Sequence, residues 1–182
     1  MFRARSIHAS LGGSLLLGAL LLVSASSASA NEQLTVQLRD DCEPISFNAA
    51  IGAGTCVRQG STTLTEFFDQ LAKDRSVDGW RFNPDAASLQ VGDSLHATNR
   101  GGERHTFTRV ASFGGSIVPP INAALGNPAP PPACLAADLK RIAPGSNTDT
   151  LVAGSSALPV GQNLFQCCIH PWMRTAITVK TN

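Results

Sequence analysis

Near its C-terminus the chain reads Phe165-Gln166-Cys167-Cys168-Ile169-His170-Pro171-Trp172-Met173. A thiol, an imidazole and a thioether follow one another here at intervals of three residues, at Cys167, His170 and Met173. The segment lies between two expected strands, so a tight loop can aim all three side chains at one point. Sulfur and imidazole nitrogen are ligands that copper prefers. The stretch therefore indicates a loop that holds a copper ion.

A second segment upstream supplies the missing ligand. It reads Asn99-Arg100-Gly101-Gly102-Glu103-Arg104-His105-Thr106-Phe107, and His105 stands at the start of an expected strand. With His105 the donors become two imidazoles and one thiolate, and Met173 can serve as a long axial ligand. This donor set is typical of blue-copper sites.

Together the two segments resemble the cupredoxins, the superfamily of plastocyanin, azurin and amicyanin. The resemblance runs from about Trp80 to Val179, and it rests on the order Trp80-Arg81-Phe82-Asn83-Pro84, Val91-Gly92-Asp93, Asn99, His105 and then Cys167-x-x-His170-x-x-Met173, which is similar to the short amicyanin-type ligand loop. It implies an all-β, Greek-key sandwich and one type 1 copper ion bound by His105, Cys167, His170 and Met173. It also implies that the Asn99 side chain braces the site. Thr106 stands where the family commonly has asparagine, and its hydroxyl can still reach the ligand loop.

The cysteine count is odd, since the chain contains Cys42, Cys56, Cys134, Cys167 and Cys168. At least one of them is therefore outside an intramolecular disulfide. Only Cys167 gives the two-residue gap to His170. Neighbours on a strand point to opposite faces, so Cys168 would point away from the copper and could bond Cys134, while Cys42 pairs with Cys56. This is one of the three pairings that four cysteines allow.

The N-terminus carries the features of a secretory signal peptide over residues 1–30. Arg3 and Arg5 precede an apolar run over 15–23, and small residues follow it up to Ala30. The run is shorter than the ~20 residues of a spanning helix, so we expect no membrane anchor and a periplasmic or secreted protein. Residues 31–182 then form one copper-binding domain with 12 basic and 13 acidic residues, a balance that gives no electrostatic case for nucleic acid.

Hydrophobic periodicity predicts many short strands and one helix. The spacing of Thr63 and Glu66 matches a capping box, which predicts an amphipathic helix over 63–73. Residues 42–56 are expected to form a cysteine-flanked loop, and 114–132 a long Pro-rich surface loop. The expected strands cover 34–39, 80–82, 88–91, 94–98, 105–111, 148–152 and 175–180, the last with Ile177 and Val179 facing inward.

One-electron transfer is the function that this copper site favours, with a redox partner docking near His170, Pro171 and Trp172. The alternative is copper carriage or storage, although Met-rich and His-rich tracts are missing from the sequence. An oxidase or reductase would need further copper centres, and only three histidines follow residue 30, so we expect no enzyme. The alternative without a metal is a secreted sandwich whose cysteines and histidines are only structural. It would explain one histidine beside one cysteine, but not two histidines, a thiol and a methionine at this spacing. His96 lies inside a strand-like run, and a structural role is expected for it.

Overall fold

The computed structural model describes residues 31–181. The predicted signal peptide, residues 1–30, lies outside the described residues. Within 31–181 no helix combines the length and the apolar character needed to cross a membrane.

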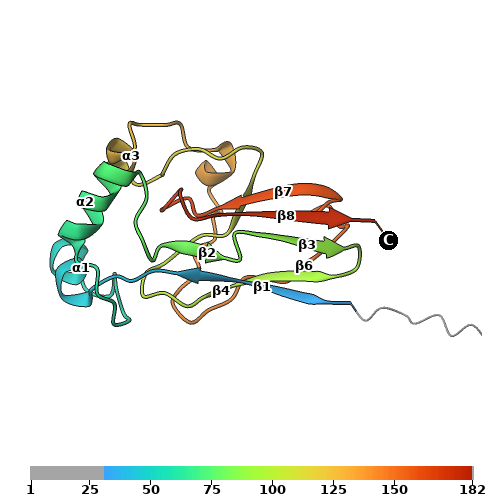
Figure 1. Ribbon diagram of the computed structural model, residues 1–182, viewed down its shortest axis with the longest axis horizontal. Helices are drawn as coiled ribbons and strands as arrows, with labels where there is room; N and C mark the ends of the chain where they lie inside the picture. Colours follow the sequence, from blue (N-terminus) through green and yellow to red (C-terminus); the bar gives the residue numbers. More distant parts are fainter. Residues whose placement is uncertain (1–30, 182) are drawn as a thin grey trace, which may run out of the picture. The chain divides into compact units, whose positions relative to one another are not determined.

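Two four-stranded sheets pack into a sandwich (Figure 1). The first has the order β2-β1-β4-β6 and the second β3-β8-β7-β5, and the chain from β2 to β7 passes from one sheet to the other at every connection. The pairs β1/β4 and β3/β8 are parallel, and the others are antiparallel. The prediction of a β-sandwich is confirmed. The strands are β1 Gln33–Arg39, β2 Arg81–Asn83, β3 Ala86–Gln90, β4 Ser94–Asn99, β5 Thr108–Val110, β6 Leu151–Val152, β7 Gly161–Gln166 and β8 Arg174–Lys180.

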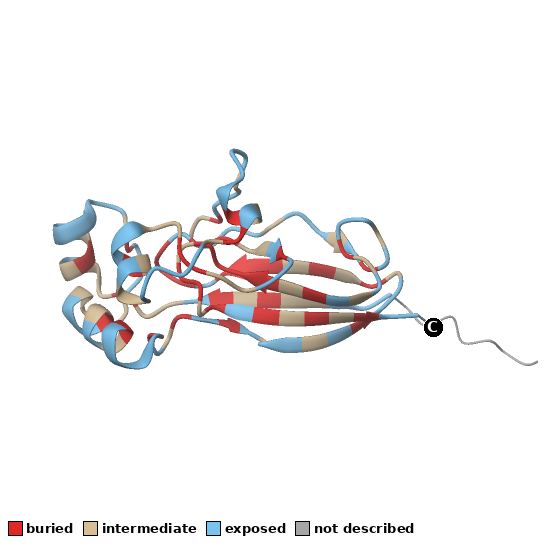
Figure 2. Ribbon diagram, turned by 90° about the horizontal axis from the view of Figure 1, so that it is seen from above, coloured by how far each residue is buried: buried red, intermediate tan, exposed pale blue. Residues whose placement is uncertain are grey.

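The core forms because apolar side chains alternate along the strands. In β8, Thr175, Ile177 and Val179 are buried between exposed ends, and in β1 Val36 and Leu38 are fully buried. Figure 2 shows this as buried segments that repeat along the arrows. Each large aliphatic side chain taken out of water contributes about 1.5 to 3 kcal/mol. The inward orientation predicted for Ile177 and Val179 is confirmed.

Helices gather at one end of the sandwich (Figure 1). Helix α2, Leu64–Asp74, has the predicted capping box, in which Thr63 and Glu66 satisfy each other's backbone amides. The expectation of a plain loop over 42–56 is wrong, because α1, Pro44–Ile51, lies there. Its N-cap is Glu43, whose carboxylate accepts hydrogen bonds from the Ile45 and Ser46 amides. Glutamate is outside the residue types usually preferred as N-caps, which is why the pattern was missed.

The Pro-rich segment 114–132 is also more structured than predicted. It contains helix α3, Pro119–Ala124, and leads into the 3₁₀ helix η1, Pro132–Leu135. Prolines occupy the first turn of both, where their missing N–H groups would have no helical partner anyway. The described residues thus contain three α-helices, not the single one expected.

The strand expected over 105–111 is shorter than predicted. Regular pairing is confined to β5, Thr108–Val110. His105 instead forms an isolated bridge, in which its amide and carbonyl pair with those of Ile142.

Candidate metal centre

Three ligand-type side chains meet inside the sandwich at the helical end. The Sγ of Cys167 lies 3.8 Å from Nδ1 of His105 and 3.9 Å from Nδ1 of His170, and the two Nδ1 atoms are 3.3 Å apart. All three side chains are buried. Atoms bound to one first-row metal ion at about 2.0 to 2.3 Å lie about 3 to 4 Å from one another. The group therefore fits a single ion with the donor set N, N and S.

A seven-residue loop presents Cys167 and His170. β7 ends at Gln166 and β8 begins at Arg174, and the two strands are paired up to these residues. Inside the loop the Cys167 amide donates to the Met173 carbonyl over 3.0 Å, and the Met173 amide donates to the His170 carbonyl over 2.9 Å. The loop is thus closed by its own backbone, and Cys167 and His170 face the same point.

Met173 is fully buried at the end of this loop. It belongs to the main hydrophobic core, and its backbone closes the turn. The sulfur of Met173 is the fourth donor that the sequence predicts, and its role as an axial ligand stays a prediction.

Asn99 holds the segment that carries His105. Its side-chain Nδ2 donates to the carbonyls of Glu103, at 2.7 Å, and Ile142, at 2.9 Å, while its Oδ1 accepts from the Gly101 amide. Ile142 also pairs with the His105 backbone. The Asn99 side-chain amide therefore holds both the residues before His105 and the segment that pairs with it. The bracing expected of Asn99 is realised through the backbone.

Thr106 links the two ligand segments. Its amide points at Cys167 Sγ over 3.4 Å, and its hydroxyl accepts from the Cys168 amide over 2.7 Å. The threonine therefore makes the contact to the ligand loop that was expected of it.

Both predicted disulfides, Cys42–Cys56 and Cys134–Cys168, are present. Within residues 31–181, Cys167 is the one cysteine outside a disulfide. Cys168 lies in a separate buried cluster with Val110 and Cys134. It therefore points away from the candidate centre, as strand alternation implied.

The electrostatics of the metal-free group favour a thiolate beside an imidazolium. Burial disfavours a charged imidazole, but hydrogen bonds to Asp40 and Cys167 outweigh it and raise the pKa of His105 to about 10. Burial likewise favours a neutral thiol, yet His105 and His170 hold the pKa of Cys167 well below its usual range. A thiolate is the form in which cysteine binds metals, so the ligand is prepared before an ion arrives.

Two carboxylates that the sequence analysis did not single out contact the outer nitrogens of the histidines. Asp40 Oδ2 lies 2.8 Å from Nε2 of His105, and Glu103 Oε2 lies 3.6 Å from Nε2 of His170. Burial of Asp40 would raise its pKa, but the contact with His105 and the amides of Gly102 and Glu103 lower it to about 2. Burial raises the pKa of Glu103. Glu103 stands in the quoted segment, whereas no local signal marks Asp40, which lies 65 residues before His105.

The segment 114–132 supports the ligand loop. The Ser116 hydroxyl donates to the Ile169 carbonyl over 2.6 Å, and the Ile117 amide donates to the Cys168 carbonyl over 2.9 Å. Together with the Cys134–Cys168 disulfide, these bonds tie two consecutive loop residues to the Pro-rich segment. Sequence spacing alone could not reveal this contact.

Aromatic rings cover His170. Only 2% of this residue is exposed, and its ring lies 6.1 Å from Phe67, 6.4 Å from Trp80 and 5.6 Å from Trp172, measured between centroids. Pro171 is buried as well, and Trp172 is half-buried. Of the three residues expected to meet a partner, Trp172 is therefore the most exposed.

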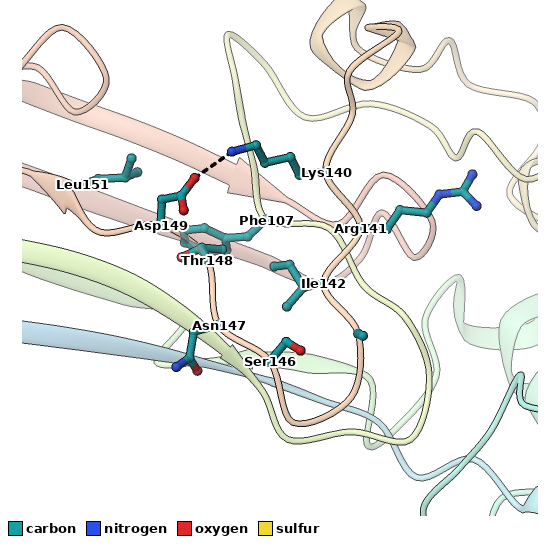
Figure 3. A pocket seen from close by; sticks show the side chains of 10 residues that line it. Phe107, Lys140, Arg141, Ile142, Ser146, Asn147, Thr148, Asp149 and Leu151 are labelled. Atoms are coloured by element: carbon teal, nitrogen blue, oxygen red, sulfur yellow. Dashed lines mark hydrogen bonds and ion pairs between the residues drawn. The ribbon is translucent and has the colours of Figure 1, made fainter.

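A surface pocket of about 500 Å³ is lined in part by Ile142, whose backbone pairs with that of His105, and its lining side chains are shown in Figure 3. Phe107 and Ile142 contribute apolar surface, and the exposed pair Lys140 and Asp149 stands across it at 2.6 Å. No histidine or cysteine lines this pocket. It therefore offers none of the nitrogen and sulfur donors that mark the candidate centre.

His96 is not part of the ligand group. On β4 its Nε2 lies 3.1 Å from the hydroxyl of Thr35 on the neighbouring strand β1. This cross-strand contact agrees with the structural role expected for it.

Comparison with known proteins finds similar solved structures. A purple cupredoxin from Nitrosopumilus maritimus is 12% identical, with a TM-score of 0.41 over 80% of this chain and 98% of that one. A mutant plastocyanin of a fern is 14% identical, with a TM-score of 0.40 over 81% of this chain and all of that one. A Cu(I) amicyanin mutant is 18% identical, with a TM-score of 0.36 over 55% and 73% of the two chains. These likenesses concern the fold alone. No protein-family model and no curated protein matches the chain.

Proposed function

We propose that this chain is an exported type 1 copper protein that binds one copper ion and carries single electrons. The ligands are His105, Cys167, His170 and Met173. The observation that carries the proposal is the meeting of Cys167 with two imidazole nitrogens inside the core. When bound, the ion would supply a one-electron redox couple. The side chains described here would hold it and exclude water.

A rigid ligand set supports electron transfer. His105 is fixed by Asn99 and Ile142, and the loop that carries Cys167 and His170 is fixed by Thr106, Ser116 and a disulfide. Groups that are held by packing and hydrogen bonds on every side cannot move far. Both oxidation states would therefore use nearly the same geometry, which keeps the reorganisation on electron transfer small.

Trp172 supports a docking surface for the redox partner. It lines a surface pocket together with Pro171, Phe113 and Leu125, and two arginines, Arg75 and Arg174, line the same pocket. Its ring contacts the His170 ring. A partner with an apolar, acidic-rimmed surface would bring its own redox centre close to His170 through this tryptophan.

Export to the periplasm or the extracellular space is supported by the two disulfides, because such bonds persist in oxidising compartments. The alternative, copper carriage or storage without electron transfer, draws support from the almost complete burial of His170. A redox carrier and a storage protein differ in how firmly they keep Cu(I).

Absorption and EPR spectra of the copper-loaded protein, residues 31–182, test the proposal. An intense visible thiolate-to-copper band would support it, and a loaded protein without this band would refute the type 1 site. Removal of Cu(I) by a modest chelator within one redox cycle would favour the storage alternative.

A further inference from the structure

A carboxylate lies beside the Nε2 atom of each histidine, Asp40 at His105 and Glu103 at His170. We propose that Asp40 and Glu103 are positioning residues that present both Nδ1 atoms to one metal ion and lower its reduction potential. This inference rests on the proposed copper site, and it adds two residues outside the ligand set.

The ring orientations carry the argument. In both histidines Nδ1 faces Cys167 and the other imidazole, while Nε2 faces a carboxylate. When a metal-binding imidazolium releases its Nδ1 proton, a carboxylate beside Nε2 holds the remaining proton there, and the lone pair lies on Nδ1. Such outer contacts fix the tautomer and the direction of a metal-binding histidine. Because both histidines have the same orientation, a coincidence of packing is a poor explanation for the two carboxylate contacts.

The Asp40 carboxylate is buried and is oriented by backbone amides so that it can accept a hydrogen bond from His105. Its side chain is 1% exposed. Its Oδ1 accepts from the Gly102 amide at 2.9 Å, and its Oδ2 accepts from the Glu103 amide at 3.0 Å as well as facing His105. These amides aim the carboxylate at the imidazole from a position at the end of β1.

The glycine pair 101–102 makes room for this arrangement. A Cβ on Gly101 would overlap the Asp40 carboxylate, and a Cβ on Gly102 would lie 2.7 Å from the Cys42 sulfur. Any larger residue at either position would push the segment off Asp40 or off the Cys42–Cys56 disulfide. The closeness of Asp40 to His105 therefore depends on two glycines that the ligand motif itself does not require.

Glu103 ties His170 to the helical end of the sandwich. Its Oε2 accepts from the Trp80 indole Nε1 at 2.7 Å and lies 3.6 Å from His170 Nε2. Trp80 is 2% exposed and packs against Phe47 and Phe67 of the two helices. The helices thereby fix the carboxylate that faces His170.

The chemical consequence follows from charge. A carboxylate that accepts the Nε2 proton makes the imidazole a stronger donor at Nδ1, and a nearby negative charge stabilises Cu(II) more than Cu(I). Both effects lower the reduction potential. Removing either carboxylate charge while keeping an acceptor oxygen should therefore raise the potential and leave the ligand set intact.

The test compares Asp40→Asn and Glu103→Gln with Asp41→Asn in the copper-loaded protein. Asp41 is the matched control, because its carboxylate accepts from the hydroxyls of Ser61 and Thr62 and from no histidine. We expect a higher potential in each of the first two variants, a larger rise in the double variant, retention of the thiolate-to-copper band in all, and a smaller shift in the control.

A second readout is the imidazole N–H signals of the Cu(I) protein in ¹H–¹⁵N spectra. The wild type should show protected Nε2–H signals from both histidines, and each variant should shift the signal of its own histidine. Potentials that match the control in both variants, or a wild type that carries its ring protons on Nδ1, would overturn the inference. If the wild type itself lacks the charge-transfer band, it is the copper site that fails.

Discussion

The sulfur of Cys167 lies 3.8 Å from Nδ1 of His105, although 62 residues separate them in the chain. The adjacent Cys168 is bonded to Cys134 in another part of the core. Two neighbouring cysteines thus have different surroundings, and this difference can be tested by substituting each of them.

Cys167→Ser should abolish the thiolate-to-copper band, because serine cannot supply the thiolate. Cys168→Ser should keep most of the band and lose stability instead. Its disulfide closes a segment of 34 residues, for which the chain-entropy model gives about 4 kcal/mol. Visible absorption and urea unfolding measure the two effects. The opposite pattern of spectra would show that Cys168 is the ligand.

Asn99→Ala should weaken the segment that carries His105. The change removes two donors and one acceptor. The Glu103 carbonyl and the Gly101 amide lose these partners, while the Ile142 carbonyl keeps the His105 amide. Each such loss costs about 1 to 3 kcal/mol. Denaturant unfolding of the metal-free protein should show the lower stability, and a competition assay should show weaker copper binding. Unchanged values in both assays would exclude a bracing role for Asn99.

The metal-free protein should lose stability in acid through Asp40. Its pKa is about 2 in the folded protein, below the ordinary 3.8, so the stabilisation is complete above pH 4 and disappears as the pH falls through 2. Linkage puts its size at about 2 kcal/mol. Unfolding free energies between pH 5 and 2 measure it. Asp40→Asn should be less stable at pH 5 and should show a flatter dependence, and a slope equal to that of the wild type would contradict the assignment.

Trp172→Asp should slow electron self-exchange. The half-buried ring contacts His170, and an aspartate would remove this ring and place a carboxylate that is costly to desolvate in the docked contact, so a slower exchange is expected. NMR line broadening in mixed-valence samples measures the rate. Val160→Asp is the control, because this exposed residue precedes β7 at the end remote from the ligand loop. Equal self-exchange rates in the two variants would argue against electron transfer through a docking surface at Trp172.

Much of the fold and the candidate ligands could be predicted from local patterns. Each of the correctly predicted patterns spans only a few residues. They are the strand alternation of Ile177 and Val179, the capping box of Thr63, and the spacing of Cys167 and His170. The missed features depend on distant contacts or on unusual residue types. Asp40 meets His105 only because β1 ends beside the Gly101 segment, and α1 begins at a glutamate cap.

The burial of His170 under aromatic rings also could not be predicted from local sequence patterns. The apolar residues of α2 predicted an amphipathic helix, but they did not reveal which surface it buries. Phe67 packs against Trp80 and His170 at once, so the histidine near which a partner was expected to dock is enclosed. This burial makes the firmness of copper retention the sharpest distinction between an electron carrier and a storage protein.

The most direct test of a type 1 electron carrier is spectroelectrochemistry of the copper-loaded protein, residues 31–182, with a modest Cu(I) chelator present. We expect an intense visible band that disappears on reduction and returns to full intensity on reoxidation over many cycles. A loaded protein without the band, or a band that is not restored because the chelator has taken the copper, would contradict it.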